Sequence, residues 1–135
     1  HFYIIDENNG SILIKKNFSS IIKPIVQNDY IFLITKNNLI IALNILSGNI
    51  IYSYDINTKI AEFLNTKKKE ADIRNIMIAN NKIFVFLKNS YVIKFNIKGT
   101  IAEINKLPTT PNTQPMFIDN SLYFLNKKNK LVIIN

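Results

Sequence analysis

The side chains that could carry chemistry in these 135 residues are few, and most lie in expected turns. The only His is His1 and there is no Cys, so neither a thiol nucleophile nor a His-based triad can form within the chain. Of the nine acidic residues, several fall between apolar runs: Asp6, Glu7, Asp29 and Asp119. Asp6 and Glu7 are adjacent and would point to opposite sides of an extended chain, a poor geometry for an acid–base pair. We therefore predict no catalytic, cofactor-binding or metal-binding residue and no bound cofactor.

The charge does not by itself indicate a nucleic-acid partner. The formal net charge of +8 comes from sixteen Lys and one Arg, Arg74. Readers of nucleic-acid sequence usually depend on Arg side chains, and the Lys residues here are spread through turns and loops. The densest cluster, Lys67 to Lys69, is typical of a solvated surface. The three Gly residues lie in separate turns, which excludes a glycine-rich phosphate loop. No apolar run exceeds five residues, so no transmembrane segment is expected.

The element that must position any site is a β-hairpin around residues 42–52. An apolar strand ends on Asn44, a tight turn closes at Ser47 and Gly48, and a second strand leaves at Asn49. Asn and Gly tolerate the backbone that such a turn needs. The same turn recurs at residues 6–10 and, one residue shorter, at residues 96–99. The hairpin is therefore one copy of a repeat.

The repeat has a period near 40 residues and consists of short strands. The residues that end the strand before each turn are Asp6, Asn44, Asn96 and Asn135, with spacings of 38, 52 and 39. Such a period is typical of the four-stranded blades of a β-propeller. We predict an all-β chain that forms a partial propeller of about three blade equivalents, with four antiparallel strands in each complete blade. The predicted parts are the end of a blade at 1–18, a blade at 21–56, an insertion at 57–72, a blade at 73–105 and the start of a blade at 113–135.

Aromatic side chains recur on the second strand of each unit, namely Phe32, Phe84, Tyr123 and Phe124, and we expect them in the core rather than on a base-stacking platform. In the two complete units the predicted strands are 21–26, 30–35, 39–44 and 49–54, then 73–79, 83–87, 91–96 and 100–104. Pro24 and Pro115 fall at strand starts, where a missing N–H is tolerated.

The longer spacing locates an insertion of about thirteen residues between two blades. Ile60, Phe63 and Leu64 are spaced to face one side of a helix, and Asn57 or Thr58 could cap it. We predict a short helix followed by a basic turn. The insertion either covers a blade edge or protrudes as a contact for a partner, since long loops on a rigid scaffold often carry binding.

The hairpin residues also carry a family resemblance. Ala42, Asn44, Gly48, Asn49 and Tyr52 lie at the spacing of the pyrroloquinoline-quinone-type propeller repeat, whose pattern is Ala-x-Asp-x-x-x-Gly-Lys-x-x-Trp. Asn44, Asn49 and Tyr52 replace the Asp, Lys and Trp of that pattern. The copy at residues 6–14 keeps the Asp and the Gly, and the third copy keeps only Asn96 and a displaced Gly99.

The resemblance implies one of two functions. The family includes quinoprotein dehydrogenases, which bind the quinone and calcium at the propeller axis, and non-enzymatic scaffolds such as the BamB-type lipoproteins of outer-membrane β-barrel assembly. The missing Trp and the few acidic residues favour the scaffold group. The resemblance thus implies a non-catalytic protein-interaction scaffold on the periplasmic face of the outer membrane, with assembly components as partners. The alternative is a fragment of a quinoprotein dehydrogenase whose active-site residues lie on other blades.

The strand pattern begins and ends within blades. We expect the polypeptide to be a segment of a longer propeller or to associate with copies of itself or a partner, because a closed propeller usually needs four to eight blades.

Overall fold

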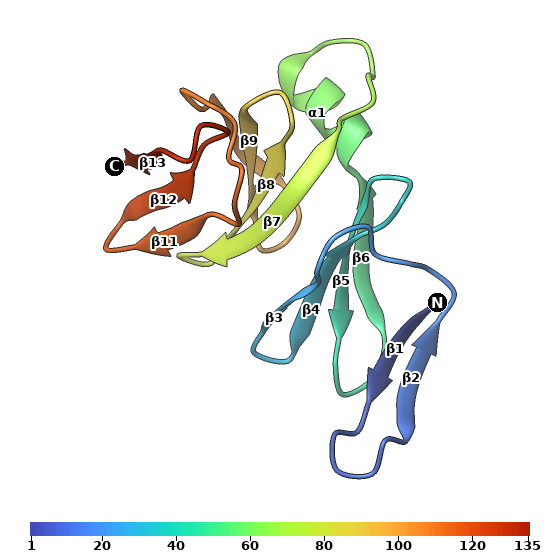
Figure 1. The fold of residues 1–135 in the computed structure, drawn as a ribbon. Coiled ribbons are helices and arrows are strands. Elements are labelled where there is room, and N and C mark those ends of the chain that lie inside the picture. Colours follow the sequence, from blue (N-terminus) through green and yellow to red (C-terminus); the bar gives the residue numbers. More distant parts are fainter. The chain divides into compact units, whose positions relative to one another are not determined.

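The computed structural model describes residues 1–135 and is almost entirely β-structure, with thirteen strands and one short helix (Figure 1). The chain divides into two compact units, His1–Lys69 and Glu70–Asn135.

The first unit contains two antiparallel sheets and the helix. β1 pairs with β2, and the second sheet has the strand order β3-β4-β5-β6. The helix α1 follows β6 without an intervening loop. The elements are β1 (Phe2–Ile5), β2 (Ile12–Lys16), β3 (Ile25–Gln27), β4 (Tyr30–Ile34), β5 (Leu39–Asn44), β6 (Ile50–Asp55) and α1 (Ile56–Leu64).

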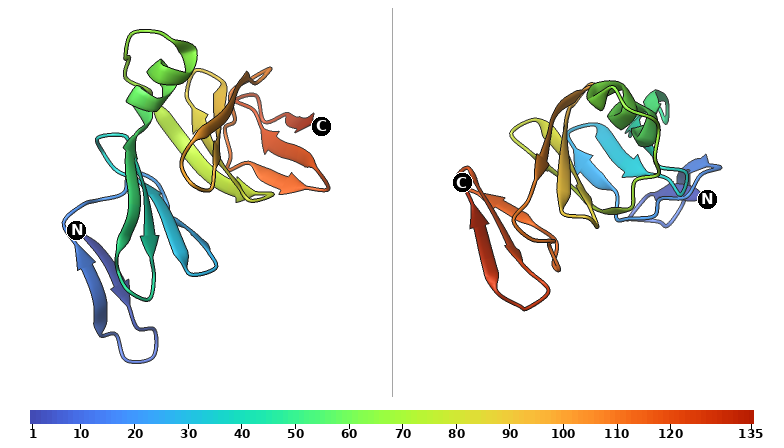
Figure 2. Two further views of the ribbon diagram at one scale, coloured as in Figure 1. Left: turned by 180° about the vertical axis from the view of Figure 1, so that it is seen from behind. Right: turned by 90° about the horizontal axis from the view of Figure 1, so that it is seen from above.

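The second unit contains a four-stranded sheet with the order β10-β9-β8-β7 and a three-stranded sheet with the order β11-β12-β13. These two sheets lie side by side in all the views (Figures 1 and 2). The strands are β7 (Ile73–Ala79), β8 (Lys82–Leu87), β9 (Tyr91–Asn96), β10 (Ile101–Lys106), β11 (Met116–Ile118), β12 (Ser121–Leu125) and β13 (Leu131–Ile134). The predicted all-β class with four-stranded antiparallel blades is confirmed.

The predicted hairpin turns form, and their backbone hydrogen bonds repeat along the chain. The Asn44 N–H donates to the Asn49 carbonyl and the Gly48 N–H donates to the Asn44 carbonyl, both at 2.9 Å. Gly48 has a φ of +70°, a conformation that costs glycine little. The same two bonds join Asp6, Gly10 and Ser11 and, across a turn that is one residue shorter, Asn96, Gly99 and Thr100.

A second kind of turn repeats at the spacing that separates Asn44 from Asn135. Between β4 and β5 the Asn38 N–H donates to the Thr35 carbonyl, and between β12 and β13 the Asn129 N–H donates to the Asn126 carbonyl. Asn38 and Asn129 both have positive φ, 57° and 56°. Asn tolerates this backbone because its short polar side chain can bond locally. The repeat seen in the sequence is therefore also a repeat of backbone geometry.

Each unit has a core between its own two sheets. In the first unit Ile31, Leu33, Ile41 and Leu43 pack with partly buried side chains that include Phe2 and Ile4 of β1 and Phe18, which follows β2. In the second unit the fully buried Phe86 belongs to a cluster of side chains from β7, β8, β9 and β12 and from the residue after β10. Its other members are Met77, Phe84, Val92, Leu107, Leu122 and Phe124. The predicted core positions Phe32, Phe84 and Phe124 are buried, whereas Tyr123 is only partly buried.

Some predicted boundaries are wrong by a few residues. The strand predicted at 21–26 is shorter, β3, because residues 21–22 bend after an isolated bridge between Ser20 and Thr35. The outer strands β6 and β10 begin one residue later than predicted and extend further, to Asp55 and Lys106. Pro24 and Pro115 directly precede β3 and β11, which agrees with the prediction that they mark strand starts.

Candidate interaction site at the helical insertion

The few side chains with catalytic potential do not come together in this structure. Asp6 lies in a turn, where its Oδ1 accepts a hydrogen bond from the Asn8 N–H at 2.8 Å. Asp119 has a φ of 46° in the turn between β11 and β12. No group of three or more His, Cys, Asp or Glu side chains lies close enough to hold a metal ion. The helix α1 is neither long enough nor apolar enough to cross a membrane. The distinctive polar arrangement lies instead at the insertion.

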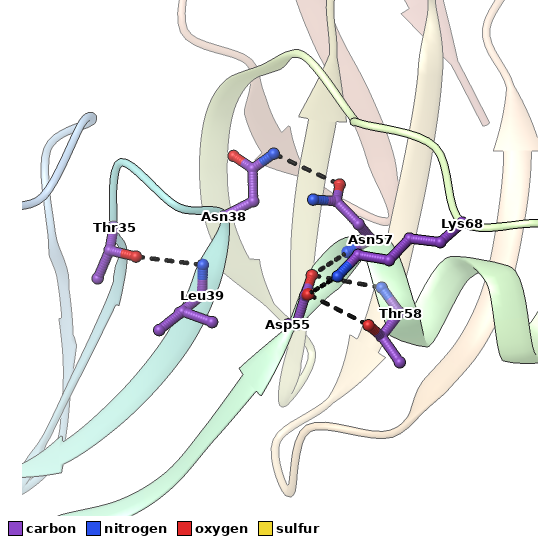
Figure 3. A network of polar contacts seen from close by, with 7 residues as sticks. All are labelled: Thr35, Asn38, Leu39, Asp55, Asn57, Thr58 and Lys68. Atoms are coloured by element: carbon purple, nitrogen blue, oxygen red, sulfur yellow. Dashed lines mark hydrogen bonds and ion pairs between the residues drawn. The ribbon is translucent and has the colours of Figure 1, made fainter.

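Asp55 is the N-cap of α1, so the predicted caps Asn57 and Thr58 are wrong. The Asp55 Oδ1 accepts hydrogen bonds from the backbone N–H groups of Asn57 at 2.8 Å and Thr58 at 3.3 Å (Figure 3). The backbone of Asp55 is extended, with φ −74° and ψ 112°, as an N-cap requires. Asn57 and Thr58 cannot cap the helix because they already form its first turn and donate the bonds that the cap accepts. The sequence signal for this cap is an Asp placed three residues before Thr58, at the last position of a strand.

The other oxygen of the Asp55 carboxylate contacts Lys68 in the loop that follows α1. The Thr58 Oγ1 donates to the Asp55 Oδ2 at 3.1 Å, and the Lys68 ammonium forms an ion pair with that oxygen (Figure 3). Burial acts to raise the pKa of Asp55, but the Lys68 ammonium and the hydrogen bonds from Thr58 and Asn57 together lower it below its ordinary value. The carboxylate is therefore held ionised, and one residue joins the start of α1 to the returning loop.

The start of α1 is also bonded to the turn between β4 and β5. The Ile56 N–H donates to the Asn38 carbonyl at 3.0 Å. The Asn38 Nδ2 donates to the Asn57 Oδ1 at 3.4 Å (Figure 3). Asn38 and Asn57 are buried, and Ile56 is fully buried. The turn is itself closed by a bond from the Leu39 N–H to the Thr35 Oγ1 at 3.2 Å. The base of the insertion is thus packed and bonded to the same four-stranded sheet that precedes it.

The C-terminal end of α1 has a defined stop. Asn65 adopts the left-handed conformation, with φ 50° and ψ 50°. The Thr66 N–H donates to the Ala61 carbonyl at 3.0 Å and the Asn65 N–H to the Glu62 carbonyl at 3.3 Å. This is the pattern of a Schellman motif with Asn in the place usually taken by Gly. The chain therefore leaves the helix in a set direction toward the lysine run.

The outer part of the insertion presents apolar and basic side chains to solvent. Phe63 and Leu64, which the helical spacing placed on one side of the helix with Ile60, are each 49% exposed. Ile60 is partly buried, and the fully buried apolar residue is Ile56, at the start of the helix. Lys67 and Lys69 are exposed and make no ion pair, whereas Lys68 bonds Asp55. We call Phe63, Leu64, Lys67 and Lys69 the insertion surface.

Comparisons with known proteins inform the fold. The sequence matches no protein-family model, and it matches no curated protein. Among solved structures, BamB from Moraxella catarrhalis has a TM-score of 0.71 at 17% identity, over 96% of this chain and 35% of that one. BBS1N, solved in complex with ARL6DN, has a TM-score of 0.70 at 13% identity, over 98% of this chain and 43% of that one. The computationally designed protein Ika8 has a TM-score of 0.55 at 12% identity, over 82% of this chain and 31% of that one.

These likenesses concern architecture alone, because all the identities are below one fifth. The chain spans about a third of the length of the BamB chain and less than half of the BBS1N chain. The sheets described above correspond over nearly the whole of this chain to parts of those larger proteins. The chain therefore has the fold of a β-propeller segment built of antiparallel blades with one short helical insertion.

Proposed function

We propose that the protein is a non-catalytic scaffold that binds other proteins, and that the insertion surface is one of its contact sites. The observation that carries this proposal is that one end of the insertion is buried and hydrogen-bonded, whereas its outer end exposes apolar side chains. Its base is fixed to a sheet through Asp55, Asn38 and the fully buried Ile56, whereas Phe63 and Leu64 remain half exposed at its outer end. Apolar side chains held outward on a rigid support are typical of binding sites.

The composition of the insertion surface indicates the chemistry of its partner. Phe63 and Leu64 offer apolar area, and Lys67 and Lys69 are cations that no carboxylate of this chain neutralises. A partner surface with an apolar patch bordered by carboxylates would complement both features. Catalysis by this chain has no comparable support, because most of its acidic side chains lie in turns, cap the helix or form ion pairs.

The resemblance of the repeat to the pyrroloquinoline-quinone type and the similarity of the fold to BamB support a more specific role. We propose that the protein acts as BamB-type factors do, in the assembly of outer-membrane β-barrel proteins. Its place would then be the periplasmic face of the outer membrane, and its partners would be components of the assembly machinery.

Site-specific photo-crosslinking tests the proposal. A photoreactive amino acid at position 63 should crosslink to a defined protein in cells of the source organism. The matched control is position 46, since Leu46 is 80% exposed but lies in the turn between β5 and β6. Phe63→Ser with Leu64→Ser should remove the partner while leaving the melting temperature nearly unchanged. Equal crosslinking at both positions, or a partner with no role in the envelope, would argue against the assignment.

A second measurement separates the scaffold from a quinoprotein. Pyrroloquinoline quinone and calcium are added to the purified chain, and its melting temperature and absorption spectrum are recorded. A ligand that binds the native state must raise the melting temperature. A scaffold that binds no quinone should therefore show no change in melting temperature or in absorption spectrum. A thermal shift at micromolar quinone would refute it.

A further inference from the structure

The turn between β1 and β2 contains a short sequence pattern that a scaffold role does not require. Asn9, Gly10 and Ser11 form the pattern Asn-x-Ser, with a middle residue other than Pro, which is the acceptor pattern for N-linked glycosylation. An acidic residue, Glu7, lies two positions before Asn9. Bacterial oligosaccharyltransferases require a carboxylate at that place as well. A pattern of this length also arises by chance, so its meaning depends on whether the fold leaves it accessible.

The turn closes on its own backbone and leaves the pattern at the surface. The Asp6 N–H donates to the Ser11 carbonyl at 2.9 Å, and the Gly10 N–H donates to the Asp6 carbonyl at 2.8 Å. Residues 7–11 are all exposed, and they form the blue loop at the lower end of Figure 1. A transferase must reach the Asn side chain, the hydroxyl two residues later and the carboxylate two residues earlier. All three lie in this exposed turn.

The side-chain nitrogen of Asn9 is available for reaction. The Ser11 N–H donates to the Asn9 Oδ1 at 2.8 Å, which joins the Asn and the Ser of the pattern in an Asx turn. This bond occupies the oxygen of the amide. No group of the chain forms a hydrogen bond with the Asn9 Nδ2, the atom to which an N-linked sugar is attached, or with the Ser11 hydroxyl.

The equivalent turn shows that a neighbouring sheet does not cover this position. Ser47 lies directly before the turn glycine Gly48, as Asn9 lies before Gly10. Gly48 is buried, and a Cβ there would lie 3.1 Å from the Ile14 side chain of the adjacent sheet. Ser47 is nevertheless exposed. A further sheet packed in the same way beside β1 and β2 would therefore contact Gly10 and leave Asn9 accessible.

The chain contains the acceptor pattern at one other place, which serves as an internal comparison. Asn17, Phe18 and Ser19 match Asn-x-Ser, but Lys15 stands where the acidic residue should be. Phe18 packs against the core of the first unit, and its ring stacks on that of Phe2 with the centroids 5.7 Å apart. The buried ring opposes removal of this segment from the surface. The second pattern therefore lacks both the carboxylate and the freedom of the first.

We propose that Asn9 carries an N-linked oligosaccharide, which an oligosaccharyltransferase adds after the chain has crossed the cytoplasmic membrane. The Asn9 Nδ2 attacks the anomeric carbon of an oligosaccharide carried on a polyprenyl diphosphate. A carbon–nitrogen bond forms as the bond from that carbon to the diphosphate oxygen breaks. The polyprenyl diphosphate leaves with the electron pair, and one Nδ2 proton passes to a base of the transferase. Glu7 and Ser11 are the groups that the transferase binds to position the amide.

This modification goes beyond the proposed function and depends only on the part of it that places the protein outside the cytoplasm. The first test is made in solution, where that placement plays no role. The purified 135-residue chain is incubated with a purified bacterial single-subunit oligosaccharyltransferase and a polyprenyl-diphosphate-linked oligosaccharide. Intact mass spectrometry should show the addition of one oligosaccharide.

Peptide mapping then locates the sugar. Trypsin cleaves after Lys15 and Lys16, so Asn9 and Asn17 fall on different peptides. The sugar should be found on the peptide that contains Asn9. Absence of transfer, or equal transfer to the peptide that contains Asn17, would overturn the proposal.

Variants of the turn separate recognition of the pattern from the stability of the fold. Asn9→Gln, Ser11→Ala and Glu7→Gln should each abolish transfer, whereas Ser11→Thr and the matched control Asn17→Gln should retain it. All these side chains are exposed, so the melting temperatures should stay close to that of the native chain. Transfer that persists in folded Asn9→Gln, or that is lost in folded Asn17→Gln, would refute the assignment to Asn9.

The second test uses the protein isolated from the envelope of the source organism. Its tryptic peptide that contains Asn9 should carry the sugar, and an unmodified Asn9 would overturn the proposal. Failure of the reaction in solution would count against the acceptor site alone, because crosslinking at position 63 reports the scaffold role separately. A protein found only in the cytoplasm would overturn both the envelope role and the modification.

Discussion

Asp55 provides the sharpest test of how the insertion is held, because its carboxylate performs two separable tasks. It caps α1 through the N–H groups of Asn57 and Thr58, and it pairs with Lys68 in the returning loop. Asp55→Ala removes both interactions. Asp55→Asn keeps a good capping side chain but removes the negative charge. Lys68→Ala removes only the ion pair.

The expected magnitudes follow from the geometry. Replacing an N-cap by Ala costs about 0.5–2 kcal/mol of unfolding free energy. The ion pair is partly exposed, with the Lys68 and Asp55 side chains 56% and 27% accessible, so it contributes about 0.2–1 kcal/mol. We expect Asp55→Ala to lower the free energy of unfolding by about 1.5 kcal/mol. Asp55→Asn and Lys68→Ala should each lower it by about 0.5 kcal/mol. For a chain of this size, 1.5 kcal/mol lowers the melting temperature by about 5 °C.

The pH dependence gives an independent check. The pKa of Asp55 is lowered in the folded protein, so its carboxylate contributes stability above the unfolded-state pKa of about 3.9. That contribution is lost as the pH falls through the lower folded-state pKa. The difference in stability between the native chain and Asp55→Asn should therefore be constant from about pH 5 to pH 8 and shrink below about pH 4.

Urea denaturation followed by circular dichroism, at several pH values, measures all three variants. The reasoning would be refuted if Asp55→Ala and Asp55→Asn lost the same free energy at neutral pH, since the cap would then contribute nothing. A difference between the native chain and Asp55→Asn that grew on acidification would contradict the direction of the pKa shift.

Further variants and a titration test other parts of the structure. Gly48→Val should lower the free energy of unfolding by roughly 1 kcal/mol or more, because φ at Gly48 is +70° and a Cβ there would lie 3.1 Å from the Ile14 side chain. Gly10 also has a positive φ but has open space around it, so Gly10→Ala should be less destabilising when both variants are compared in thermal melts. Phe86→Ala should lose about 3–5 kcal/mol because the ring is fully buried in the core of the second unit, and a loss below about 1 kcal/mol in urea denaturation would contradict that core. Burial, and after it the repulsion from Tyr54, raises the pKa of Tyr52 well above its usual range. In an alkaline absorbance titration Tyr52→Phe should therefore lack an ionisation step that the native chain shows only at very high pH.

Local chemistry explains why the sequence predicted the repeating framework. A hairpin turn depends on a few adjacent residues, and the Asn and Gly at positions 44 and 48 favour the backbone that the turn needs. The strands at 39–44, 73–79 and 91–96 are mostly apolar and lie between polar turns, so their bounds could be predicted from the local sequence. The two complete blades and the position of the insertion were therefore predictable.

The sites depend on contacts between residues that are distant in sequence, and only the tertiary structure decided them. Asp55 became the cap because β6 runs directly into α1, and its charge is matched by Lys68, thirteen residues away. Helical spacing put Ile60, Phe63 and Leu64 on one face, but it could not tell that the sheet buries Ile56 instead and leaves Phe63 exposed.

The same reason applies to three lysines of the second unit. They look dispersed in the sequence, but Lys82, Lys94 and Lys106 line one groove because they come from the neighbouring strands β8, β9 and β10. Periodicity along a chain reports which residues share an element. It does not report which elements meet, because that is set by the packing of whole sheets.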